Sequence, residues 1–215
     1  MSKNRSMVWR VVIYLLGMIV LAMGITLNTE AGLGSSAIIS VPYTISLGTG
    51  LSFANLTLAL YCLFVAAEFI INGKNRRVVD ILQIPLSIVF TRFLALFKLM
   101  LGYQPGNFAR DLATLMAGMI LTGIGAAITV DMQLIPNPGD GIVSCIANRV
   151  HKELGFTKNC VDLCCVGISL LLGTFFGSPL LGVGLGTVIS MIGVGRVIAV
   201  FNHLVKERLC KAAGL

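Results

Sequence analysis

Six long apolar runs dominate this sequence and leave few folds open to it. A membrane-spanning helix needs about 20 mostly apolar residues to cross a hydrocarbon layer of roughly 30 Å. The runs that meet this requirement cover residues 8–28, 51–71, 79–101, 112–130, 158–177 and 180–204, with bounds good to a few residues. We therefore predict an all-α membrane protein with six transmembrane helices.

The composition agrees with a lipid environment. Of the 215 residues, 56% are hydrophobic and only 12% are charged, and the mean hydropathy is +0.93. Soluble domains carry about 25% charged residues. The net charge of +7 does not indicate nucleic-acid binding, because the basic residues form short clusters between the apolar runs. We expect the lipid bilayer as a partner and no nucleic acid.

Two further apolar stretches, residues 35–47 and 139–153, are too short to cross a membrane alone. At about 1.5 Å per residue, each covers only about 20 Å. Both begin beside glycine and small polar residues or proline, which start a helix readily. We predict two half-helices here, and the sequence leaves open whether they are re-entrant or interfacial.

Lysine and arginine are distributed on alternate connections. The loops after the first, third and fifth spans are nearly free of them, and positive charge collects on the cytoplasmic side of membrane proteins. We therefore expect both termini in the cytoplasm. The clusters are Lys3, Arg5 and Arg10, then Lys74, Arg76 and Arg77, then Arg149, Lys152 and Lys158, and finally Lys206, Arg208 and Lys211.

The two halves of the chain, residues 1–104 and 105–215, resemble each other. Each half has three spans and one half-helix, so the second half must enter the membrane from the opposite side. We predict one membrane domain built as an inverted-topology repeat, and interrupted segments at matching places indicate a transporter's central site. The matches include Leu16-Gly17-Met18-Ile19 with Ala117-Gly118-Met119-Ile120, Gly24 with Gly125, Glu30 with Asp131, and Arg92 with Arg196.

Arg92 and Arg196 fall within the third span of each half. A charge at such depth usually faces a cavity or the bundle interior, and a guanidinium group binds carboxylate or phosphate in bidentate fashion. We hypothesise that the two side chains bind an anionic substrate. The alternatives are that Arg92 pairs with Glu68 or Asp80, or that each arginine reaches an interface.

The starts of the half-helices supply the other candidate binding residues. The segment Asn137-Pro138-Gly139-Asp140-Gly141 opens the second, and a glycine-rich helix N-terminus attracts anions. Asp140 has other roles open to it, as a helix cap or as a ligand for a cation or proton. The full set of candidate substrate-binding residues is Arg92, Arg196, Asp140, Gly139, Gly141, Asn137, Ser35 and Ser36.

We expect neither an enzyme nor a cofactor, because no nucleophile–base pair or metal motif stands out. Cys160 and Cys164 share a helix face with Asp162 close by, which makes a soft-metal site conceivable. Metal motifs bring further ligands at defined spacing, so we interpret these cysteines as packing residues. We predict no catalytic and no metal-binding residues.

A set of glycine-containing motifs carries a family resemblance: Gly24, Gly34, Thr49-Gly50-Leu51-Ser52, Pro138-Gly139-Asp140-Gly141 and Gly184-x-Gly186-Thr187. On these residues the chain resembles the YczE/YyaS/YitT group of bacterial integral membrane proteins, most closely the YczE-like branch, over nearly its full length. In the first half Ser35-Ser36-Ala37 stands where such proteins often have a Pro-Trp-Asp-like start. The resemblance implies a fold and a bacterial inner membrane more than an activity.

These features favour a membrane transporter for a small molecule or ion, either a secondary transporter or a uniporter, with its site between the half-helices. Two alternatives stay open. One is a substrate-binding membrane subunit of a transport complex, and the other is a non-transporting scaffold or regulator. The sequence does not identify the substrate, and it leaves open whether the chain forms a homo-oligomer.

Overall fold

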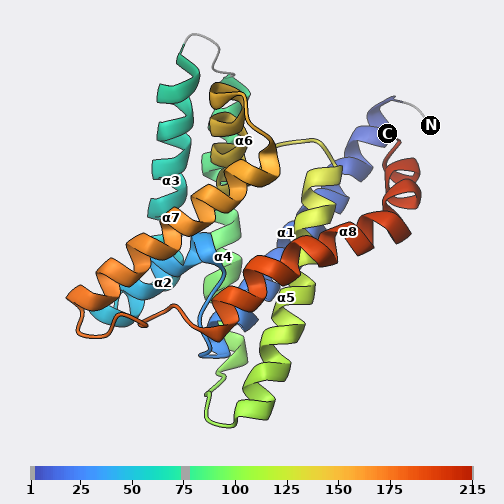
Figure 1. Cartoon of the computed structure of the whole chain (residues 1–215). Helices are drawn as coiled ribbons and strands as arrows, with labels where there is room; N and C mark the ends of the chain where they lie inside the picture. Colours follow the sequence, from blue (N-terminus) through green and yellow to red (C-terminus); the bar gives the residue numbers. More distant parts are fainter. Residues whose placement is uncertain (1–2, 74–77, 215) are drawn as a thin grey trace.

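The computed structural model describes residues 3–73 and 78–214, and the regular structure in these residues is helical (Figure 1). Six helices are long and apolar enough to span a membrane, which confirms the predicted number. They are α1 (Lys3–Glu30), α3 (Phe53–Asn72), α4 (Gln83–Leu101), α5 (Phe108–Asp131), α7 (Leu154–Phe175) and α8 (Leu185–Ala213).

Two short helices stand where half-helices are predicted: α2 (Ala37–Thr49) and α6 (Pro138–Val150). The last span is the one whose bounds differ most from the prediction. It starts at Leu185 because the preceding segment turns at Gly182, whose φ is +78°. It continues to Ala213 because the charged residues after 204 still support a helix once it is formed, although they end the apolar run.

The helices pack in pairs around a central contact between α1 and α5. Helix α4 packs on α1 and α8 on α5, while α2 lies against α7 and α6 against α3 (Figure 1). Glycines bring α1 and α5 close together. A Cβ at Gly24 would collide with the backbone of Thr122, and one at Gly125 with the backbone of Leu21. Small residues serve this purpose in membrane bundles.

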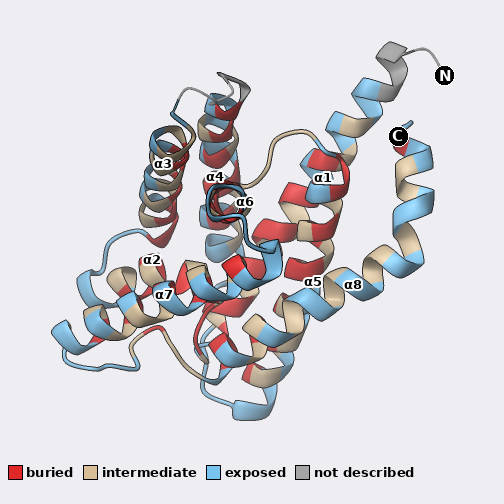
Figure 2. Ribbon diagram, turned by 45° about the horizontal axis from the view of Figure 1, so that its top comes forward, coloured by how far each residue is buried: buried red, intermediate tan, exposed pale blue. Residues whose placement is uncertain are grey.

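Figure 2 shows buried residues where the helices meet and exposed residues on the outside, and many of the exposed side chains are large and apolar. Large apolar side chains such as Leu99 and Phe175 are more than four-fifths exposed, whereas Asn28, Glu68 and Asp131 are each less than a twentieth exposed. Soluble monomers rarely expose contiguous apolar surface of this extent. The chain is therefore a multi-pass membrane protein whose outer surface suits lipid.

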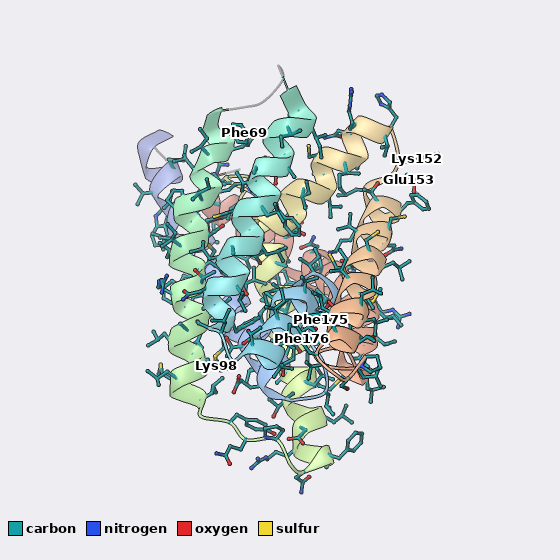
Figure 3. All side chains as sticks on the ribbon, turned by 90° about the vertical axis from the view of Figure 1, so that its left-hand side faces the viewer. Phe69, Lys98, Lys152, Glu153, Phe175 and Phe176 are labelled. Atoms are coloured by element: carbon teal, nitrogen blue, oxygen red, sulfur yellow. The ribbon has the colours of Figure 1, made fainter. Side chains whose placement is uncertain are left out.

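Both termini lie on the same side of the molecule, as an even number of spans requires (Figure 1). Lys152 lies toward that side, and Lys98 lies toward the opposite end (Figure 3). The cluster of Lys74, Arg76 and Arg77 and the side chains of Lys3 and Arg5 lie outside the described residues.

Candidate functional site

A cavity of about 340 Å³ lies where the N-terminal ends of α2 and α6 meet. This volume is at the lower end of the range for small-molecule sites. Its walls come from α1, α2, α3, α5, α6, α7 and α8, and most of them are apolar. The polar residues that line it are Ser36, Tyr61, Thr122, Asn137, Asp140, Lys158, Asn159, Asp162 and Ser190.

Helix α6 begins with a side-chain cap from Asn137, whose Oδ1 accepts a hydrogen bond from the backbone N–H of Gly139 at 3.0 Å. Pro138 follows at the first helical position, where its missing N–H has no cost. Asn137 also shares a side-chain hydrogen bond with Tyr61 of α3. Asn137, and not Asp140, therefore caps the N-terminus of α6. Asp140 lines the cavity instead.

The cavity holds three charged side chains, from α6 and α7. Lys158 Nζ lies 3.4 Å from Asp162 Oδ1, one helical turn away on α7. Asp140 lies near enough to feel the charge of Lys158, but within the described parts of the chain it has no ion pair or hydrogen bond to its carboxylate. The site therefore contains two acids and one lysine, and Asp140 is the acid that the lysine does not pair with.

The N-terminus of α2 differs from that of α6. Ser36 is the N-cap residue, yet its side chain accepts no hydrogen bond from the first turn. The first N–H groups of a helix have no acceptor within it, so α2 presents its positive end to the cavity through Ala37 and Ile38. Ser35 lies behind the cavity wall, fully buried, and its N–H donates to Gly182 O at 3.3 Å.

The remaining predicted residues divide between the cavity wall and other places. Gly139 lines the cavity. Gly141 instead faces Glu68 of α3, and a Cβ at Gly141 would lie 2.5 Å from Glu68 Oε1. A side chain there would displace the Glu68 carboxyl.

Arg92 and Arg196 are exposed and do not line the cavity. Arg92 Nη2 donates to Asn55 Oδ1 at 3.5 Å, while Glu68 accepts from Gln83 rather than from Arg92. The geometry does not bring the two guanidinium groups to one site, because each lies on an outward face of its helix.

Six polar lining residues were not among those predicted to bind substrate: Tyr61, Thr122, Lys158, Asn159, Asp162 and Ser190. Tyr61, Thr122 and Ser190 are each a single polar residue within an apolar run, which is the only signal that the sequence offered for them. Such residues are common in membrane helices, where they bond to their own backbone or to a neighbouring helix.

Residues 8–203 match DUF6198, which is described as a family of unknown function. The chain belongs to the DUF6198 family. No curated protein and no solved structure matches it.

Two ion pairs join spans of this DUF6198 protein. Lys98 Nζ lies 3.4 Å from Glu30 Oε1, and Lys206 Nζ lies 2.8 Å from Asp131 Oδ1. Glu30 ends α1 and Asp131 ends α5, so each pair joins the first and last spans of its own half. Both acids are engaged with lysine at the ends of their helices.

Proposed function

We propose that this protein is a secondary transporter or uniporter for a small solute, and that the solute binds in the cavity between α2 and α6. The observation that carries the proposal is the convergence of two short-helix N-termini and three charged side chains, Asp140, Lys158 and Asp162, on one cavity. Half-helices whose ends meet near the centre of a bundle are typical of transporter sites.

We also propose that residues 1–104 and 105–215 form an inverted repeat, with α2 and α6 as its re-entrant half-helices. The pattern of helix contacts supports it: α1 with α4 corresponds to α5 with α8, and α2 with α7 corresponds to α6 with α3. The close contacts of Gly24 with Thr122 and of Gly125 with Leu21 correspond in the same way.

The charges in the cavity favour a solute that carries both a cationic and an anionic group. The unpaired carboxylate of Asp140 suits an ammonium group, which donates charge-assisted hydrogen bonds. The uncapped first turn of α2 suits a carboxylate or another small anion. Lys158 is already paired with Asp162 and leaves Asp140 available for the solute.

We place the protein in a bacterial cytoplasmic membrane with both termini inside, and we retain the relation to the YczE-like group as a hypothesis. The one-sided distribution of basic residues in the sequence supports the orientation. The glycine-containing motifs of the sequence support the relation to the YczE-like group.

Thermal-shift screening of the purified protein, followed by uptake into proteoliposomes, tests the function. The panel contains small amines, small carboxylates and zwitterions of similar size. We expect zwitterions to stabilise the protein most. Asp140→Asn should weaken their binding about tenfold or more, because a hydrogen bond to a charged group contributes about 1.5–3 kcal/mol and about 1.4 kcal/mol is a factor of ten.

Arg92→Met and Arg196→Met are the matched controls, since both side chains are exposed and outside the cavity. They should leave binding and uptake unchanged. A loss of uptake in either variant would support the hypothesis that the two arginines bind an anionic substrate. Binding without uptake would favour a substrate-binding subunit of a transport complex. Full affinity in Asp140→Asn would contradict the proposed site.

A further inference from the structure

A buried carboxyl–amide pair lies against α6 at Gly141, the residue that follows Asp140. Glu68 of α3 and Gln83 of α4 are 4% and 1% exposed. Gln83 Nε2 donates a hydrogen bond to Glu68 Oε2 at 2.9 Å. The pair sits within the spanning helices, where an ionisable side chain usually has a function.

Two acceptor atoms of this pair have no donor among the residues that the structure describes. Glu68 Oε1 and Gln83 Oε1 are both buried and make no hydrogen bond. Both atoms face the Cα of Gly141, because a Cβ there would lie 2.5 Å from the first and 3.1 Å from the second. Buried polar atoms in folded proteins are nearly always hydrogen-bonded, so two such orphans side by side call for an explanation.

One proton accounts for both atoms. A protonated carboxyl group has one O–H donor and a carbonyl acceptor, and a primary amide has a carbonyl acceptor and two N–H donors, so the two groups can form two parallel hydrogen bonds. With a proton on Glu68 Oε1, the carboxyl O–H would supply a donor beside Gln83 Oε1, while Gln83 Nε2 donates to Glu68 Oε2. In such a cyclic pair both orphan oxygens take part in a hydrogen bond, and Glu68 carries no charge.

We infer that Glu68 is a proton-binding site that couples proton movement to the central cavity, in a transporter as proposed above. The binding step takes one proton from water onto the Glu68 carboxylate, and release returns it. No other reactant is needed.

The contacts of α6 connect this proton site to the cavity. Asp140 and Gly141 are neighbours on its first turn, and Asp140 lines the cavity while Gly141 abuts Glu68. Gln83 also lines a second cavity of about 10 Å³ together with Tyr61 and Asn137, and those two residues line the main cavity as well. A space of this size holds about one water molecule. Movement of α6 therefore alters both sites together.

Among the described residues, two other titratable groups lie near Glu68. Asp80 approaches from the 3-10 helix η2 (Val78–Leu82), and its charge acts on Glu68. Cys145 approaches from α6, with its Sγ 3.8 Å from the backbone oxygen of Glu68 and 3.3 Å from Asn72 Oδ1. A pH effect on the whole protein includes these groups, so the test must isolate the Glu68 carboxyl.

Infrared difference spectroscopy of the purified full chain isolates the signal of the Glu68 carboxyl group. The spectrum of the wild type minus that of Glu68→Gln should contain the carbonyl band of one protonated carboxylic acid at neutral pH. That band should disappear as the pH is raised, and Gln83→Met should shift its frequency because the cyclic partner is gone. Glu207→Gln removes an exposed carboxylate paired with Lys211 and is the control, which should leave the band intact.

The absence of the band at every pH would show that Glu68 is ionised and would overturn the inference. A band that persists at every pH would show a permanently neutral carboxyl and would overturn the coupling. With a transported solute in hand, a pH gradient should drive its accumulation in the wild type and fail to do so in Glu68→Gln. The infrared result decides the proton site without any solute, so this inference and the proposed function fail separately.

Discussion

The acidic side chains inside this protein differ in whether a cation reaches them. Asp131 is 2% exposed at the end of α5, and the partly exposed Lys206 extends from α8 to meet it at 2.8 Å. Lysine suits this role, because its long stem packs on apolar surface while the ammonium group reaches a buried acid or the membrane edge. Within residues 3–73 and 78–214, Glu68 has no such partner and pairs with an amide. Each arrangement avoids an isolated charge in the interior.

Removal of the Lys206 ammonium group should therefore destabilise the protein. Lys206→Met leaves the Asp131 carboxylate buried without its partner, which should cost about 1–3 kcal/mol. The double variant Lys206→Met with Asp131→Asn should recover part of that loss, since the stranded charge is gone. Thermal unfolding in detergent measures both.

Lys211→Met is the comparison for this prediction, because Lys211 forms an i,i+4 pair with Glu207 in which both side chains are mostly exposed. Exposed pairs contribute at most about 1 kcal/mol. An equal loss of stability in Lys206→Met and Lys211→Met would mean that burial of Asp131 has no energetic consequence.

At the scale of helices, the contact between α1 and α5 depends on glycine. Gly17 and Gly24 of α1 and Gly118 and Gly125 of α5 all face the partner helix, and each would collide with it through a Cβ. In lipid no hydrophobic force draws helices together, so close van der Waals packing has to do so. The central pair is therefore sensitive to a single added methyl group.

Gly125→Ala should push α1 from α5 and cost about 1–3 kcal/mol, the usual range for overpacking. The matched control is Gly167→Ala in the middle of α7, where an added Cβ meets nothing within 4 Å. That substitution should be neutral or slightly stabilising, because alanine favours helix over glycine by about 1 kcal/mol. Comparable melting temperatures for the two variants would contradict this account of the α1–α5 contact.

At the scale of the whole molecule, the even number of spans and the basic clusters imply one orientation. Lys152, between α6 and α7, lies toward the termini, and the connection between α4 and α5 lies at the opposite end (Figures 1 and 3). Loops at opposite ends of a spanning bundle face opposite compartments.

Cysteine labelling in intact bacterial cells tests the orientation. In a background without the six native cysteines, of which Cys160 and Cys164 are exposed, Gln104→Cys should react with a membrane-impermeant maleimide from outside. Lys152→Cys should react only after the membrane is permeabilised. Labelling of Lys152→Cys in intact cells would show that the orientation is the reverse of the proposed one.

The residues of the candidate site were predicted unevenly. Asn137, Gly139, Asp140 and Ser36 were found because the start of a short apolar helix beside glycine is a local pattern, and all four line the cavity. Arg92 and Arg196 were chosen for their depth in the sequence, but depth does not reveal which way a side chain points. In a soluble helix the apolar stripe marks the inner face, whereas a helix in lipid is apolar on both faces.

The sequence by itself determined the class of the protein, the six spans and the two short helices, because hydropathy and segment length are properties of consecutive residues. Only the tertiary structure decided which side chains meet. Glu68, Gln83 and Gly141 come from three different helices, and their significance lies in two oxygens that face one glycine. Contacts of that kind depend on packing between residues far apart in the chain, which no local pattern encodes.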